Sequence, residues 1–101
     1  MNAPEGGNRT ARQMTARFRG DVQGVGFRYT TVHLAADLDV RGFVQNEMDG
    51  SVTVVAEGTE DVLLLLVRRI RESPLGRCIT GESISWSAPT GAFRVFTVRY
   101  G

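Results

Sequence analysis

The spacing of apolar residues changes several times along the first half of the chain. Apolar and polar residues alternate over residues 14–22, which predicts a β-strand with one buried face. Apolar residues then recur at helical spacing over residues 27–38, and two further strand-like runs cover residues 40–45 and 51–57. Asp49-Gly50 is a strong turn signal between these two runs, so we expect them to pair as an antiparallel hairpin.

The second half of the chain predicts one helix and two strands. The helix should follow an N-cap at Thr59 and stop at residues 73–76, which contain a proline and a glycine. Strands are expected over residues 78–86 and 93–100. The complete order favours an α+β fold, a split βαβ arrangement with two helices on one face of an antiparallel sheet. The apolar stripe of the second helix comprises Val62, Leu63, Leu66, Val67 and Ile70.

The first residues of the chain show neither pattern. Residues 1–12 are rich in Gly, Asn, Arg and Pro, and we expect them to form a disordered tail. The remaining residues, 13–101, are enough for one domain with one hydrophobic core.

Charge and composition exclude several classes of function. The formal net charge is only +1, so the chain lacks the basic field that nucleic-acid binding requires. All 12 basic residues are Arg, and the absence of Lys excludes a nucleotide-binding loop with a phosphate lysine and Schiff-base chemistry. Cys78 is the only cysteine, so no intrachain disulfide can form. No apolar run is long enough for a membrane span or a signal-peptide core, so we expect a soluble, cytoplasmic protein.

A glycine-rich segment between the first strand and the first helix carries the clearest chemical signal. Residues 20–28 read Gly-Asp-Val-Gln-Gly-Val-Gly-Phe-Arg. Exposed backbone, a helix N-terminus and the guanidinium of Arg28 together form a cradle suited to a single phosphoryl group. Tyr29 stands where a dinucleotide fingerprint requires its third glycine, which excludes that alternative. The glycines alone could equally make a tight turn, but a plain turn requires neither Gln23 nor Arg28.

A second cluster, Gly-Phe-Val-Gln-Asn-Glu-Met-Asp-Gly-Ser-Val over residues 42–52, contains Asn46. Together with residues 20–28 it resembles the two sequence motifs of the acylphosphatase family, at the separation found in that family. The resemblance extends over about residues 15–98. It implies a ferredoxin-like α/β sandwich, a monomer without cofactor, and hydrolysis of small acyl phosphates to carboxylate and inorganic phosphate.

The resemblance also implies roles for individual residues. Arg28 would bind the phosphate of the substrate, and Asn46 would orient the attacking water. Without Arg28, Asn46 would be read as a turn residue before Asp49. The loop would supply the backbone cradle, which comprises Asp21, Val22, Gln23, Gly24, Val25, Gly26, Phe27 and Arg28.

Two residues depart from the family pattern. Asp21 brings a negative charge to the phosphate loop, and we expect it to point away from the Val22 side and to weaken substrate binding only modestly. Asp39 stands where the family often has glycine after the first helix, and aspartate tolerates the left-handed conformation expected there.

These few residues suffice for the expected chemistry. The leaving group of an acyl phosphate is a carboxylate, which departs without protonation, so no general acid is required. Fixed donors and a positioned water can supply most of the catalysis. We expect His33 on a solvated helix face, Cys78 in a packing role and no metal site, because the spacing of the carboxylates fits no calcium loop.

Two other functions compete with catalysis. The same fold could be a non-catalytic or regulatory anion-binding module. RNA-recognition motifs share the split βαβ topology, but the run of stacking aromatic residues that they require is absent from residues 51–57.

Overall fold

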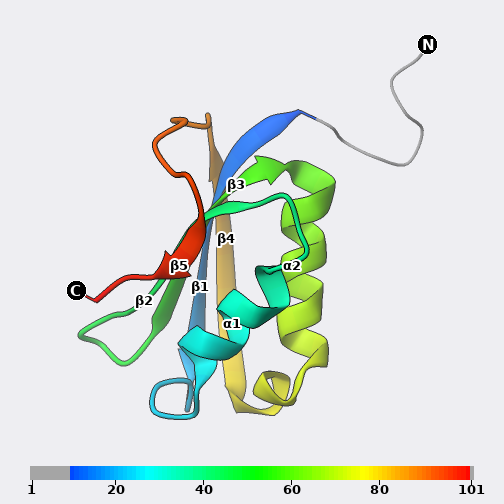
Figure 1. Ribbon diagram of the computed structural model, residues 1–101. Helices are drawn as coiled ribbons and strands as arrows, with labels where there is room; N and C mark the ends of the chain where they lie inside the picture. Colours follow the sequence, from blue (N-terminus) through cyan, green and yellow to red (C-terminus); the bar gives the residue numbers. More distant parts are fainter. Residues whose placement is uncertain (1–9, 101) are drawn as a thin grey trace.

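The computed structural model describes residues 10–100. The strands and α-helices follow one another along the chain in the order that the sequence predicts (Figure 1). No helix in this part of the chain has the length and apolar character needed to cross a membrane. The elements are β1 (Ala11–Gly20), α1 (Phe27–Ala35), β2 (Arg41–Asn46), β3 (Val52–Thr59), α2 (Glu60–Glu72), the 3-10 helix η1 (Pro74–Cys78), β4 (Ile79–Ser87) and β5 (Phe96–Val98).

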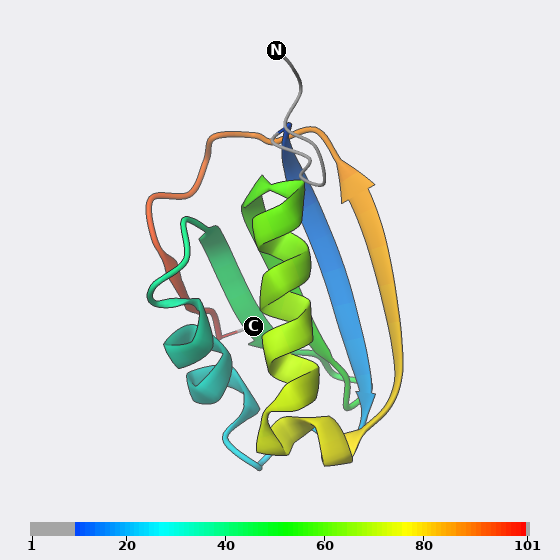
Figure 2. The ribbon, with the colours of Figure 1, turned by 90° about the vertical axis from the view of Figure 1, so that its right-hand side faces the viewer.

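The strands form one sheet in the order β4-β1-β3-β2-β5, and both helices cover the same face of it (Figure 2). The ferredoxin-like α+β fold is thereby confirmed. The pairs β1–β3, β1–β4 and β2–β3 are antiparallel, as predicted. The fifth strand, β5, runs parallel to β2, so the sheet is mixed. The strand β4 lies at one edge of the sheet, and β5 lies at the other edge, beside β2. The chain reverses its direction while it crosses between these edges, so β5 runs in the same direction as β2.

Residues that alternate along the strands form the core between sheet and helices. Met14, Ala16 and Phe18 of β1 are fully buried, as their spacing predicts. From α2, four of the five predicted stripe residues are buried, whereas Val62 is half-buried. Leu64 is 45% exposed, which places it outside the stripe. Each fully buried aliphatic or aromatic side chain contributes about 1.5–3 kcal/mol through removal of apolar surface from water.

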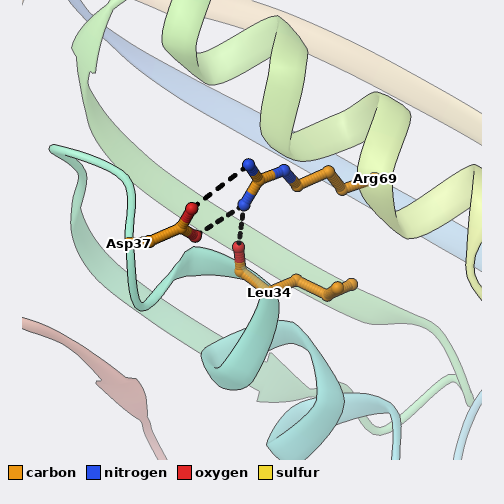
Figure 3. A network of polar contacts seen from close by, with 3 residues as sticks. All are labelled: Leu34, Asp37 and Arg69. Carbon is orange, nitrogen blue, oxygen red and sulfur yellow. Dashed lines mark hydrogen bonds and ion pairs between the residues drawn. The ribbon is translucent and has the colours of Figure 1, made fainter.

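One polar contact fixes the C-terminal end of α1 against α2. Nη1 of Arg69 donates to the carbonyl of Leu34 at 3.0 Å and to the carboxylate of Asp37 at 2.6 Å (Figure 3). The hydrogen bond from Arg69 lowers the pKa of Asp37.

Helix α1 ends at Ala35, three residues before the predicted end at residue 38. Asp39 does not take the left-handed conformation, since only glycines have positive φ among residues 10–100.

The disordered tail was predicted over residues 1–12, but its last two residues belong to the sheet. Ala11 and Arg12 belong to β1, where they pair with Thr59 and Gly58 of β3. This pairing extends the sheet by two positions that the composition of the tail concealed. Residues 1–9 lie outside the described residues, so the disorder predicted for them stays a prediction.

The strand predicted over residues 93–100 covers only Phe96–Val98. The preceding residues are used instead to cross from β4 to the other edge of the sheet. A buried carboxylate holds this crossing segment: Glu57 accepts hydrogen bonds from the amide and the hydroxyl of Thr90 and from the amide of Gly91. The alternation of apolar residues over residues 93–100 has two origins. Phe93 packs on Phe43 outside any strand, and only Phe96–Val98 form a strand.

Candidate active site

The glycine-rich segment, residues 20–28, begins at the last residue of β1 and ends in the first turn of α1, and its loop lies between the two elements. Gly24 and Gly26 both have left-handed backbone, with φ of 80° and 78°. Left-handed residues in a turn can direct successive N–H groups toward one concave side, which is a known geometry for anion binding. Gly26 is also the N-cap of α1, and Thr30 makes the first backbone bond, to the Gly26 carbonyl at 2.9 Å. The amides of Phe27 and Arg28 thus belong to the first turn, which a helix leaves without intrahelical acceptors.

A cavity of about 200 Å³ opens beside this loop. It brings Arg28 and Asn46, the two predicted catalytic residues, into one lining although they are 18 positions apart in the chain. Gly24 and Gly26 are exposed in this wall, so their backbone is accessible from the cavity. The complete lining comprises Val22, Gly24, Gly26, Phe27, Arg28, Tyr29 and Asn46.

Arg28 is held by an aromatic ring instead of a carboxylate. Its guanidinium carbon lies 5.0 Å from the centre of the Tyr100 ring. No ion pair involving Arg28 occurs within residues 10–100. A cation–π contact orients the guanidinium but leaves its N–H groups available as donors to a phosphate. The charge of Arg28 is therefore positioned without being neutralised.

Asn46 is the last residue of β2 and pairs with Val52 of β3. The sheet fixes its backbone, while its side chain makes no hydrogen bond to the protein within the described residues. The side-chain amide can therefore donate to and accept from a water molecule in the cavity. This geometry suits a residue that holds water better than it suits a turn residue.

Gln23 ties the loop to the turn that follows Asn46. Its side-chain amide donates to the carbonyl of Glu47 at 2.7 Å and to the carbonyl of Ser51 at 2.8 Å. Asp49 closes the same turn by accepting from the amide and the hydroxyl of Ser51. These bonds from Ser51 lower the pKa of Asp49. Gln23 thus links the glycine-rich segment to the turn beside Asn46, and we expect it to position the two relative to each other.

Three residues of the predicted cradle do not line the cavity. Asp21 is exposed and its amide donates to the Cys78 carbonyl at 3.0 Å, so this amide is not free for a phosphate. Gln23 faces the neighbouring turn, and the side chain of Val25 is exposed. Gly20 allows the close approach at Cys78, because a Cβ there would lie 2.2 Å from the Cys78 carbonyl oxygen.

The other chemical candidates lie outside this cavity. His33 is exposed on α1, as expected, and Cys78 is half-buried in η1. No group of three or more His, Cys, Asp or Glu residues between positions 10 and 100 could hold a metal ion. A larger cavity, of about 490 Å³, lies at the opposite end of the sheet, beside Arg41 and the ionised carboxylate of Glu57. Neither predicted catalytic residue and no residue of the glycine-rich segment belongs to its lining.

Sequence reasoning missed two residues of the site. Tyr29 lines the cavity, and its hydroxyl shares a hydrogen bond with the hydroxyl of Tyr100. Tyr100 is not part of the cavity lining, but its ring lies against the guanidinium of Arg28. The sequence contains an indication for Tyr29, because a large aromatic residue stands outside the buried face of α1, directly after Arg28. No pattern in the sequence connects Tyr100 with the loop.

Comparisons with known proteins identify the family of this chain. The acylphosphatase family model matches residues 14–98. The acylphosphatase of Salinibacter ruber is 43% identical over 90 residues, which cover 89% of this chain and 95% of the relative. The acylphosphatase of Thermotoga petrophila is 38% identical over 88% of this chain and 98% of its own length. The crystal structure of the Bacillus subtilis acylphosphatase superposes with a TM-score of 0.80 at 33% identity, covering 88% of this chain and 99% of that one. The chain therefore belongs to the acylphosphatase family.

Proposed function

We propose that this chain hydrolyses small acyl phosphates in the cavity between the glycine-rich loop and Asn46. The observation that carries the proposal is the shared lining: Arg28, Asn46 and the exposed backbone of Gly24 and Gly26 surround one space. The phosphate would be held by backbone amides of residues 22–28 and by the guanidinium of Arg28, in keeping with how loops and helix N-termini bind anions. Asp21 contributes no amide to this set, because its N–H is bonded to Cys78.

The proposed reaction is direct attack of water on phosphorus. Asn46 holds the water, the bond from phosphorus to the acyl oxygen breaks, and the carboxylate leaves with the bonding electrons. The attacking water brings both of its protons into the product, dihydrogen phosphate, which releases one of them to solvent near neutral pH. Because a carboxylate leaves without protonation, neither a general acid nor a metal is needed. The role of the protein is to position the water and to stabilise charge on the phosphoryl oxygens with fixed donors.

Steady-state hydrolysis of benzoyl phosphate in EDTA tests the proposal. Arg28→Ala and Asn46→Ala should each lower kcat by about a hundred- to a thousandfold, the usual effect of losing one preorganised donor. Arg94→Ala is the matched control: Arg94 is exposed and precedes Val95, which pairs with the first half of β2, away from Asn46. Absence of turnover by the parent protein, or full activity of both site variants, would refute the assignment.

The same experiment separates catalysis from simple anion binding. A chain that binds inorganic phosphate through Arg28 but never hydrolyses benzoyl phosphate would be the non-catalytic module. A cytoplasmic location, a monomeric state and independence of metal ions remain predictions from the sequence.

A further inference from the structure

Exposed apolar side chains gather at the end of the molecule that carries the cavity. Within residues 10–100, six large hydrophobic residues are strongly exposed, and four of them belong to the segments around the cavity. Tyr29 and Tyr100 are 60% and 68% exposed. Val25 lies between the two cavity glycines, and Met48 follows Asn46 by two positions. The other two, Leu64 and Val95, lie elsewhere on the surface.

Tyr29 and Tyr100 are linked at the ends of their side chains. Their hydroxyl groups share a hydrogen bond, and the Tyr100 ring also contacts the guanidinium of Arg28. The hydroxyl bond restrains both side chains before any ligand arrives, so little further entropy is lost when a ligand packs on the rings. Arg28 thus lines the cavity while its guanidinium lies against the Tyr100 ring.

The rest of the cavity lining adds no further charged or amide side chain. Arg28 and Asn46 are the only lining residues with charged or amide side chains, and both are used by the phosphate and the water. Val22 and Phe27 are buried hydrophobic residues, and the two glycines offer only backbone. A second charged group on the substrate would therefore find no partner in this lining.

We propose that the aromatic pair Tyr29–Tyr100 receives the acyl part of the substrate and selects flat, apolar acyl groups. This inference rests on the proposed function and assigns a substrate class to it: aromatic acyl phosphates are favoured over acetyl or carbamoyl phosphate and over acyl phosphates that carry a second charge. A ring on the substrate stacks against the tyrosine rings while its phosphate remains on Arg28.

Stable phosphonates test recognition of the acyl part without the reaction. Calorimetric titration should show that benzylphosphonate binds about three- to tenfold more tightly than methylphosphonate, the gain expected from one aromatic pair. Tyr29→Ala and Tyr100→Ala should bring this affinity ratio close to one, whereas Tyr29→Phe, which keeps the ring, should retain it. Val95→Ala removes an equally exposed apolar side chain outside the cavity and should keep the parental ratio.

The affinity ratio separates a role in recognition from a role in holding Arg28. If Tyr100 only positions Arg28, Tyr100→Ala weakens both phosphonates equally and the ratio stays at its parental value, which would overturn the inference. Equal affinity of the parent protein for the two phosphonates would also overturn it. Turnover of benzoyl phosphate together with equal phosphonate affinities refutes the aromatic subsite alone. Absence of turnover refutes the proposed function and removes the substrate class with it.

Discussion

Replacing Glu57 by glutamine should remove a large part of the acid sensitivity of this fold. The Glu57 side chain is buried at the end of β3, and its carboxylate holds the segment that crosses from β4 to β5. It accepts hydrogen bonds from the Thr90 amide and hydroxyl, both at 2.8 Å, from the Gly91 amide at 3.0 Å and from Gln13 at 2.8 Å. Glutamine keeps the size but cannot accept with both of its terminal atoms.

The size of the effect follows from the pKa of Glu57. Burial alone would raise this pKa, but the hydrogen bonds from Thr90, Gln13 and Gly91 outweigh burial and lower it from 4.5 to about 2. Each pKa unit corresponds to about 1.4 kcal/mol, so the ionised carboxylate stabilises the folded state by about 3 kcal/mol. Because the pKa is lowered on folding, this contribution is complete above pH 4.5 and is lost as the pH falls toward 2.

The assay is urea unfolding of the parent and of Glu57→Gln at a series of pH values from 7 to 2. The difference in free energy of unfolding should be about 3 kcal/mol at neutral pH and should shrink toward zero at the acid end. Glu72→Gln is the matched control, because Glu72 is exposed and its ion pair with Arg68 lies on the surface. A constant difference across the whole pH range would refute the reasoning, since the variant would then act only through packing.

Three further predictions concern the loop, the sheet and the reaction. Gln23→Ala removes one of two donors from each of the carbonyls of Glu47 and Ser51, which keep a backbone amide as partner. The free energy of unfolding should fall by about 0.5–1.5 kcal/mol per lost bond and kcat on benzoyl phosphate should fall with it; an unchanged kcat would contradict the positioning role. Gly42→Ala would place a Cβ 1.9 Å from the Val55 carbonyl oxygen and should cost about 3 kcal/mol or more in urea unfolding. The control Gly50→Ala meets no atom within 4 Å and should cost only about 1 kcal/mol from its positive φ; equal losses would argue against the steric explanation. Hydrolysis in H₂¹⁸O should put the label into phosphate, as mass spectrometry can show, whereas label in the carboxylate would mean attack on carbon.

The sequence predicts most of the fold because periodicity reports burial directly. The α2 stripe, the β1 alternation and the Asp49-Gly50 turn are local patterns. The turn and four of the five stripe residues appear where expected, and the alternation holds as a strand up to Gly20, so that residues 21–22 of the predicted strand belong to the loop. The parallel pairing of β5 was not predictable in this way. It depends on which edge of the sheet the chain reaches after crossing, and no local pattern between residues 88 and 95 specifies that edge.

The candidate site shows the same division. Local sequence motifs indicated Arg28 and Asn46 as candidate site residues, and both line one cavity of the structure. Contacts between distant segments could not be read from spacing. The bond from Asp21 to Cys78 removed one amide from the expected cradle, and Tyr100 reached the site only through tertiary packing.

The central claim is that residues 22–28, with Arg28 and Asn46, hold one phosphoryl group. Titration of the ¹⁵N-labelled chain with inorganic phosphate, followed by amide chemical shifts, tests it most directly. The account predicts saturable shifts that are largest for the backbone amides of residues 22–28 and for the side-chain amide of Asn46, small at Asp21, and abolished by Arg28→Ala. Shifts centred on the cavity beside Arg41 and Glu57, or shifts that survive Arg28→Ala, would contradict it.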